Sequence, residues 1–267
     1  KISKADREYL QERGVTGAYK DTFFTFPKRT NDFMDRFKEN LQDRGLDTDC
    51  LENVPGFYLK NNKWDFMSNE GIGFPIQDRK GRIIGIQIRR KNNDAPRYIW
   101  FSSTFACGKK NCMYGIGPGS PIDVVRPMEQ KNHVVCITEG KFKAIALAQI
   151  GLMAVSMQGI SNWKSAAETA VDIINKEKWF KNSSKTSIWL CYDADAKINE
   201  PVHQSLKNIV AYIKSNNLKY KICVWPITSG KGIDDVINAG KMKDIAKVKS
   251  MPLYKRVRSN PNRTYKK

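Results

Sequence analysis

Residues 134–151 read VVCITEGKFKAIALAQIG, and this stretch decides the class of fold. Its first five residues form a short, mostly apolar run that is typical of a strand buried on both faces. Glu139 and Gly140 follow directly, and the remaining residues form a helical pattern that stops at Gly151. A buried strand, a tight connection and a helix in this order indicate a βαβ unit.

The same rhythm continues along the chain to residue 240. Further strands are expected within 152–159, 186–196 and 219–227, and helices within 163–180, 202–217 and 234–240. Strands that alternate with helices of this length are joined by crossovers and form a mostly parallel sheet. We therefore expect residues 128–240 to form an α/β domain whose sheet is flanked by helices.

Residues 1–127 have a different pattern, in which short helices and hairpins are mixed. Helices are expected at 4–13 and 31–44, and hairpins at 57–67 and 73–90. Ile84, Ile86 and Ile88 alternate with other residues, as in a half-buried strand. This half is expected to be a mixed α+β subdomain that precedes the parallel domain.

The charge of the chain favours a polyanionic partner. Lys and Arg number 46 and Asp and Glu 27, so the net charge is 46 − 27 = +19. This balance points to nucleic acid before an anionic membrane, although a solvated lysine-rich surface is the simpler alternative. Residues 79–110 hold nine basic residues and one acid among strand-like residues, and residues 241–267 hold ten and one. We expect the first cluster to form a fixed phosphate-binding surface, or merely to protect an edge strand, and the second to be a flexible basic tail.

Several classes of protein are disfavoured by composition. Apolar residues make up 40% of the chain and aromatic residues 10%, which is enough for a buried core. No apolar run is long enough to cross a membrane, and the charged start lacks the apolar core of a signal peptide. Six cysteines in 267 residues are too few for a disulfide scaffold. We expect reduced thiols, a cytoplasmic location on DNA and no membrane partner.

Carboxylates follow three of the expected strands. Glu139 follows the first, Asp193 and Asp195 end the third, and Asp234 comes shortly after the last. The carboxyl ends of parallel strands meet at one edge of a sheet, so these side chains are expected to converge there. Converging carboxylates repel one another unless cations neutralise them, and oxygen ligands suit Mg²⁺ or Mn²⁺. The alternative is that they cap helices, which is a stronger alternative for Asp234 than for the others.

The sequence disfavours a zinc site. Cys107 and Cys112 have the spacing of half a site, but His133, His203 and scattered cysteines are all that remain for the other half. Cys136, Cys191 and Cys223 fall inside apolar strands and are expected in the core.

The pattern of strand, Glu-Gly and helix, followed by strand and Asp-x-Asp, resembles the TOPRIM domain of bacterial-type primases, topoisomerases and certain nucleases. The ordered series GFPIQDRKGRIIGIQIRR, RYIWFSSTF, MYGIG and CITEGKFKAIALAQIG resembles the catalytic core of DnaG-type primases, particularly divergent relatives on plasmids, phages and other mobile elements. The resemblance covers about residues 5 to 240. It implies a basic DNA-facing subdomain at 1–127, a TOPRIM domain at 128–240 and a basic tail at 241–267.

The resemblance also implies roles for individual residues. Glu139 would act as general base or metal ligand, Asp193 and Asp195 as catalytic metal ligands, and Asp234 as a further metal-site acid. The expected nucleic-acid or nucleotide contacts are Arg82, Arg89, Arg90, Lys91, Arg97, Tyr98, Lys141, Lys143 and Lys231. The implied partners are single-stranded DNA, nucleoside triphosphates and a fused or recruited replicative helicase.

The sequence departs from this family at three places in the site, one of which is the segment AKINEP after Asp195, where the family usually has a turn that contains Gly. DnaG-type primases usually have an Asp four residues after the Glu, where this chain has Lys143, and an acid is missing at Gly232. Lys143 pairs with a neighbouring acid, binds a phosphate, or marks a site that has lost catalysis. We therefore expect a primase-like nucleotidyltransferase. The alternatives are a non-catalytic nucleic-acid-binding TOPRIM module of a replication protein and a TOPRIM nuclease.

Overall fold

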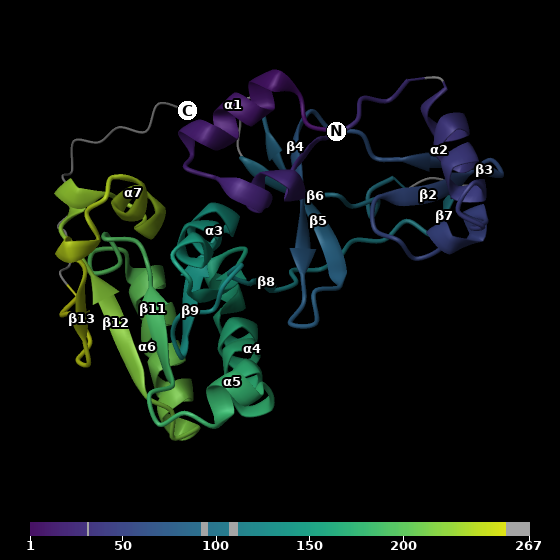
Figure 1. Cartoon of the computed structure of the whole chain (residues 1–267). Coiled ribbons are helices and arrows are strands. Elements are labelled where there is room, and N and C mark those ends of the chain that lie inside the picture. Colours follow the sequence, from purple (N-terminus) through teal and green to yellow (C-terminus); the bar gives the residue numbers. More distant parts are fainter. Residues whose placement is uncertain (31, 92–95, 107–111, 255–267) are drawn as a thin grey trace, which may run out of the picture. The chain divides into compact units, whose positions relative to one another are not determined.

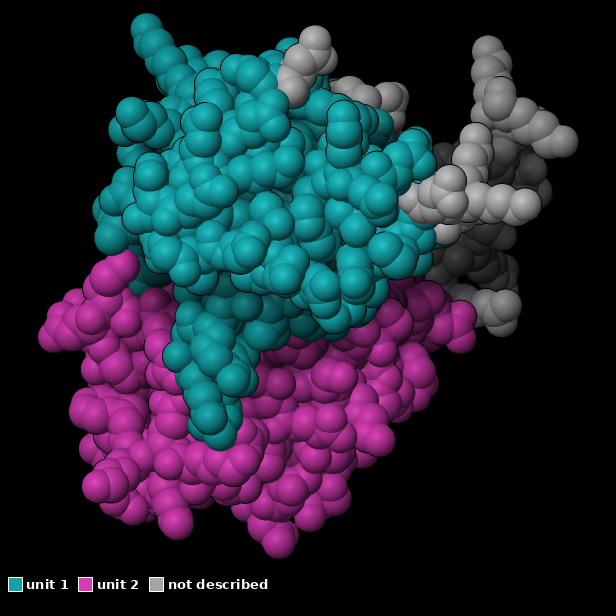
Figure 2. Space-filling model, turned by 90° about the vertical axis from the view of Figure 1, so that its right-hand side faces the viewer, with its two compact units in different colours: residues 1–121 teal, residues 122–267 magenta. Residues whose placement is uncertain are grey.

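The computed structural model describes residues 1–30, 32–91, 96–106 and 112–254. The chain divides into two compact units, Lys1–Pro121 and Ile122–Lys267, which have different colours in Figure 2. This division falls slightly before the boundary expected at 127/128. The reason is that strand β8 (Asp123–Val125) pairs with β10 of the second unit.

The second unit is built on a six-stranded sheet in the order β13-β12-β11-β9-β10-β8 (Figure 1). Its four central strands, β9 (Val134–Glu139), β10 (Met153–Met157), β11 (Ser187–Cys191) and β12 (Tyr220–Val224), are parallel. The edge strands β8 and β13 (Ala246–Val248) are antiparallel to their neighbours. The predicted, mostly parallel sheet flanked by helices is therefore confirmed. The expected flexible tail, in contrast, begins with an ordered strand, because β13 pairs with β12.

Helices cover this sheet and supply most of its core. They are α3 (Lys141–Gln149), α4 (Trp163–Lys176), α5 (Lys178–Lys181), α6 (Glu200–Ser215) and α7 (Ile233–Asn238). Helix α3 packs against α7, and α4 packs against α6. The core joins Ile174 of α4 and Ile209 of α6 to Ile137 of β9 and Leu190 of β11. Each fully buried side chain of this kind stabilises the fold by about 1.5–3 kcal/mol, so the carboxyl ends of the strands sit on a rigid base.

The first unit contains two antiparallel sheets. One has the order β1-β4-β5-β6, with β1 (Phe24–Thr25), β4 (Gly71–Gln77), β5 (Ile83–Arg90) and β6 (Tyr98–Trp100). The other has the order β3-β2-β7, with β2 (Phe57–Lys60), β3 (Lys63–Phe66) and β7 (Cys112–Met113). Its α-helices are α1 (Lys4–Glu12) and α2 (Phe33–Gln42). Short 3-10 helices complete the two units at Gly17–Thr22, Thr48–Leu51, Ile160–Asn162, Ile227–Ser229 and Met242–Asp244.

Both predicted hairpins are present. In the β2–β3 hairpin the turn residues Asn61 and Asn62 have φ values of 50° and 59°, which asparagine tolerates better than most residues. The alternation expected along β5 is only partly observed, because Gln87 is as buried as Ile88 while Ile84 is exposed. Strand β6 pairs with β5 only at residues 87–89, so the edge of β5 is covered there and is open at Ile83 and Ile84.

The cysteines are distributed as expected in the second unit and differently in the first. Cys136, Cys191 and Cys223 are free and buried on three adjacent strands. Cys112 is disulfide-bonded, which departs from the expectation of reduced thiols throughout. Cys107 lies outside the described residues, so the zinc prediction stays untested. Within the described ranges, no helix has the length and apolar character needed to span a membrane.

Candidate active site

The predicted acids lie where the parallel strands end. Glu139 is the last residue of β9, and Asp193 lies in the loop that follows the neighbouring strand β11. The Thr138 hydroxyl donates a hydrogen bond of 2.9 Å to the Cys191 carbonyl and so ties these two strand ends together. A third loop is tied to the second, because the backbone N–H of Ala194 donates to the carbonyl of Lys231 at 2.9 Å. Loops from β9, β11 and β12 thus meet at one edge of the sheet.

The charges around Glu139 act on its ionisation. Burial raises the pKa of the Glu139 carboxyl, and the negative charges of Asp193 and Asp195 raise it further. The positive charges of Lys143 and Lys231 oppose this shift without cancelling it. The five side chains therefore form one electrostatic group, which we call the strand-end cluster.

Each aspartate of the strand-end cluster has a lysine partner. The Lys143 ammonium forms an ion pair with Asp193, and both side chains are largely buried, with 19% and 22% exposed. The Lys231 ammonium lies 3.4 Å from an Asp195 carboxylate oxygen, and its side chain is mostly exposed. The two lysines thus neutralise charge that three converging carboxylates would otherwise concentrate at this edge.

Asp234 and its neighbour have different structural roles. Asp235 caps helix α7, because its carboxylate accepts the backbone N–H groups of Lys231 and Gly232 at 3.1 and 2.9 Å. Asp234 is only 2% exposed, and its carboxylate lies where a side chain on Gly232 would begin.

The strand-end cluster does not fit a divalent ion held by the protein alone. Its oxygen donors suit Mg²⁺ or Mn²⁺ chemically. However, no group of three or more His, Cys, Asp or Glu residues in the described part of the chain is arranged to hold a metal ion. The Lys143–Asp193 and Lys231–Asp195 pairs supply positive charge where such an ion would otherwise be needed.

Lys141, which the sequence predicts to contact nucleic acid or nucleotide, is buried in the structure. Its side chain is 4% exposed and its ammonium lies 3.0 Å from the carboxylate of Asp123, which is completely buried. Lys141 begins α3 and Asp123 begins the edge strand β8, so this ion pair joins helix to sheet. A lysine enclosed in this way is not available to a nucleotide, and we assign it a structural role.

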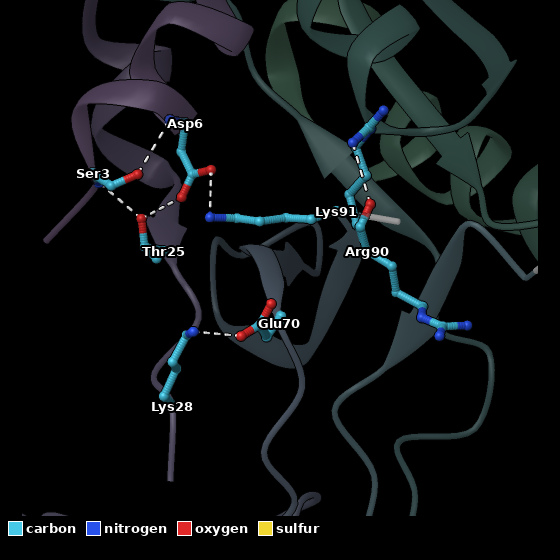
Figure 3. A network of polar contacts seen from close by, with 8 residues as sticks. Ser3, Asp6, Thr25, Lys28, Glu70, Arg90 and Lys91 are labelled. Atoms are coloured by element: carbon cyan, nitrogen blue, oxygen red, sulfur yellow. Dashed lines mark hydrogen bonds and ion pairs between the residues drawn. The ribbon is translucent and has the colours of Figure 1, made fainter. Parts of the chain in front are cut away.

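The basic residues predicted in the first unit divide by their contacts. Arg82 forms ion pairs with Asp78 inside the β4–β5 hairpin, with a shortest distance of 2.6 Å. Lys91 lies 3.3 Å from a carboxylate oxygen of Asp6, a buried residue that also accepts a hydrogen bond from Thr25 (Figure 3). Both cations are thus already matched by acids of the same unit.

The remaining three arginines lie on two faces of one sheet. Arg89 pairs with Tyr98 across β5 and β6, and its guanidinium lies 4.1 Å from the centre of the Tyr9 ring on α1. The backbone N–H of Arg90 donates to the carbonyl of Arg97 at 2.9 Å. Since successive residues of a strand point to opposite faces, Arg90 lies on the face opposite to Arg89. Arg97, directly before β6, is held beside Arg90 by this backbone hydrogen bond. In Figure 3 the Arg90 side chain points away from the Asp6–Lys91 contact.

Two residues with a clear role were not singled out from the sequence. Asp123 neutralises Lys141, and Tyr9 stacks under Arg89. Both contacts join segments far apart in the sequence, so no local pattern indicates them.

Comparisons with known proteins identify relatives of this fold. A family model described as a domain of unknown function (DUF3854) matches residues 126–243. The DNA primase of Escherichia coli K12 is 25% identical over 217 residues, which are 79% of this chain and 34% of that protein. The DNA primase of Pseudomonas aeruginosa PAO1 is 28% identical over 218 residues, which are 78% of this chain and 29% of that protein. The chain therefore spans about a third of the length of the curated relatives it matches.

Solved structures show the same fold. The zinc-binding and RNA polymerase domains of the Aquifex aeolicus primase give a TM-score of 0.56 at 14% identity, covering 92% of this chain and 57% of that one. A DnaG catalytic core gives 0.56 at 19% identity, covering 92% of this chain and 74% of that one. A DnaG catalytic domain bound to single-stranded DNA gives 0.55 at 17% identity, covering 91% and 72%. The chain thus has the fold of a DnaG primase catalytic core, and the predicted resemblance to DnaG-type primases is confirmed. The predicted link to mobile elements stays a prediction.

Proposed function

We propose that this chain is a primase-like nucleotidyltransferase that synthesises oligonucleotide primers on single-stranded DNA during replication of a chromosome or mobile element. The observation that carries the proposal is the convergence of Glu139, Asp193 and Asp195 at the carboxyl edge of a parallel sheet, in a chain with this fold. Its similarity to proteins named DNA primase favours synthesis over a non-catalytic TOPRIM module or a TOPRIM nuclease.

In this reaction a 3′-hydroxyl oxygen attacks the α-phosphorus of a nucleoside triphosphate, a new P–O bond forms, and pyrophosphate leaves. Glu139 is the proposed acceptor of the proton of the attacking hydroxyl, and its raised pKa, which brings it nearer to neutral pH than an ordinary glutamate, supports this role. Lys231 is the proposed contact to the phosphates of the nucleotide, and its mostly exposed position beside Asp195 supports this role.

Mg²⁺ or Mn²⁺ is proposed to arrive with the nucleotide. Such ions keep several water ligands and bind phosphate oxygens readily, so the triphosphate supplies donors that the protein arrangement lacks. When bound, the ion would neutralise charge on the phosphates. We assign no further step to it.

The template is proposed to lie against Arg90 and Arg97 of the first unit. Neither side chain has an ion pair or ring contact among the described residues, in contrast to Arg82, Arg89 and Lys91. A relative of the same fold is described as bound to single-stranded DNA, which supports this class of ligand. A replicative helicase, fused or recruited, remains a proposed partner, and we propose a cytoplasmic location on DNA.

The proposal is tested by incubating the chain with single-stranded DNA, labelled ribonucleotides and Mg²⁺ or Mn²⁺. Template-dependent oligonucleotides are expected. Shortening of an end-labelled template in the absence of nucleotides would instead favour the nuclease alternative. Template binding without either product would favour the non-catalytic module.

A further inference from the structure

Lys143 lies at the centre of the strand-end cluster rather than at its rim. It is the third residue of α3, and its ammonium reaches across to Asp193 in the loop after β11. Its positive charge also acts on Glu139, which ends the strand before α3. One side chain thus bridges two of the three loops that form the site.

Lys143 also reaches the third loop, at Gly232. A Cβ atom added to Gly232 would lie 2.8 Å from Cε of Lys143 and would also meet the Asp234 carboxylate. The backbone at Gly232 is extended, with φ −94° and ψ 162°, so the local conformation admits any residue. A side chain at Gly232 would require the ends of the Lys143 and Asp234 side chains to shift, because they occupy this space. The lysine at position 143 and the glycine at position 232 therefore depend on each other, because the Lys143 side chain lies where a side chain at position 232 would begin.

The two lysines offset part of the negative charge at this edge without any bound ion. Glu139, Asp193 and Asp195 contribute up to three negative charges and a fourth carboxylate, Asp234, lies beside Lys143, whereas Lys143 and Lys231 contribute two positive charges. Lys143 contributes more to neutralising the carboxylates than Lys231 does, because the Lys143–Asp193 ion pair is largely buried whereas Lys231 is mostly exposed. Buried pairs are screened little by salt, whereas exposed pairs contribute about 0–1 kcal/mol or less.

We propose that Lys143 is an internal cation that takes the place of a protein-bound divalent ion beside Asp193. The resting site is then closed to Mg²⁺ or Mn²⁺ until a nucleotide brings the ion with it. This inference rests on the proposed function only in taking the strand-end cluster as the active site. It concerns metal binding in the absence of nucleotide and template.

The test compares Mn²⁺ binding by the whole chain and by Lys143→Asp, without nucleotide, using titration calorimetry and thermal unfolding with Mn²⁺ or with EDTA. The matched control is Lys164→Asp, which makes the same charge change at an exposed lysine of α4. Wild type and the control should bind Mn²⁺ equally weakly and unfold at the same temperature with or without it. Lys143→Asp should bind Mn²⁺ about tenfold more tightly or better, because an attractive charge replaces a repulsive one, and Mn²⁺ should raise its unfolding temperature.

Two further variants complete this test. Lys143→Ala should show a smaller gain in the same direction, and it decides the outcome if Lys143→Asp does not fold. Adding Asp193→Asn to Lys143→Asp should abolish the gain. The inference is overturned if wild type binds Mn²⁺ as tightly as Lys143→Asp, if neither lysine variant gains affinity, or if the gain survives Asp193→Asn. None of these outcomes depends on whether wild type makes primers, so failure of this inference and failure of the proposed function are distinguishable.

Discussion

The backbone N–H of Arg90 donates to the carbonyl of Arg97, so these two arginines face each other at the end of the β5–β6 ladder. Arg89, one residue earlier, points to the opposite face and stacks over Tyr9. The cluster of arginines that looks uniform in the sequence is therefore divided between two surfaces. Only one of these surfaces has arginines without an intramolecular partner among the described residues.

We predict that Arg90→Ala combined with Arg97→Ala weakens binding of single-stranded DNA and flattens its salt dependence. Each lost phosphate contact should change the slope of log affinity against log salt by about 0.7, so two contacts change it by about 1.4. Fluorescence anisotropy across a salt series measures this slope. The control is Lys60→Ala with Lys63→Ala, which removes two charges that face each other across the β2–β3 hairpin. Equal slopes in both double variants would place the DNA elsewhere.

Arg89→Ala should behave differently from the Arg90 and Arg97 variant. Its guanidinium is engaged by the Tyr9 ring, and its Nε is buried. We expect a loss of stability of roughly 1 kcal/mol and little change in the salt slope of DNA binding. Urea unfolding and the same anisotropy series measure the two effects. A large change in slope with unchanged stability would show that Arg89 contacts the template.

The buried Lys141–Asp123 pair should be a strong determinant of stability. Lys141→Met leaves the Asp123 carboxylate enclosed without its cation, and breaking a buried pair in this way typically costs about 3–5 kcal/mol. Lys131→Met, at an exposed pair with Glu129, should cost at most about 1 kcal/mol. Adding Asp123→Leu to Lys141→Met should recover most of the loss. If Lys141→Met is as mild as Lys131→Met, the structural role assigned to Lys141 is wrong.

Glu139 should make stability depend on pH. Because its pKa is raised in the folded state, the folded chain holds a proton that the unfolded chain releases, and stability falls as pH rises between the unfolded and folded pKa values. Glu139→Gln removes this effect. The variant should match wild type in acid, below both pKa values, and should be more stable than wild type above the folded value. Thermal unfolding across this range measures the difference, and a variant less stable at neutral pH would contradict the assigned direction.

The parallel sheet and its acids were predictable because local patterns determine them. Buried strands such as Val134–Glu139 have a distinct composition, and a carboxylate at a strand end keeps that place in any βαβ arrangement. The partners of Lys141 and Lys143 were not predictable. Each lysine follows Glu139 within four residues, yet one turns into the core toward Asp123 and the other toward Asp193. The ion-pair partner of each lysine depends on which segments, distant in the sequence, the fold brings close to it.

The same reasoning explains the errors in the first unit. The β4–β5 and β2–β3 hairpins follow from local turns and alternation, and they were predicted. The burial of Gln87 depends on how far β6 extends along β5, and the engagement of Arg89 depends on α1. Neither contact produces a periodic pattern of apolar residues from which it could be predicted. In the second unit, the edge strand β8 was not predicted because three residues are too few to give a pattern.

The central claim is that Glu139 takes part in joining nucleotides, and one gel series tests it most directly. Wild type, Glu139→Gln and the exposed control Glu129→Gln are incubated with single-stranded template, all four labelled ribonucleotides and Mg²⁺ or Mn²⁺. We predict oligonucleotide products from wild type and from Glu129→Gln. With Glu139→Gln, synthesis should fall by about 10²–10⁴-fold while template affinity is unchanged. Equal product from wild type and Glu139→Gln would contradict the account.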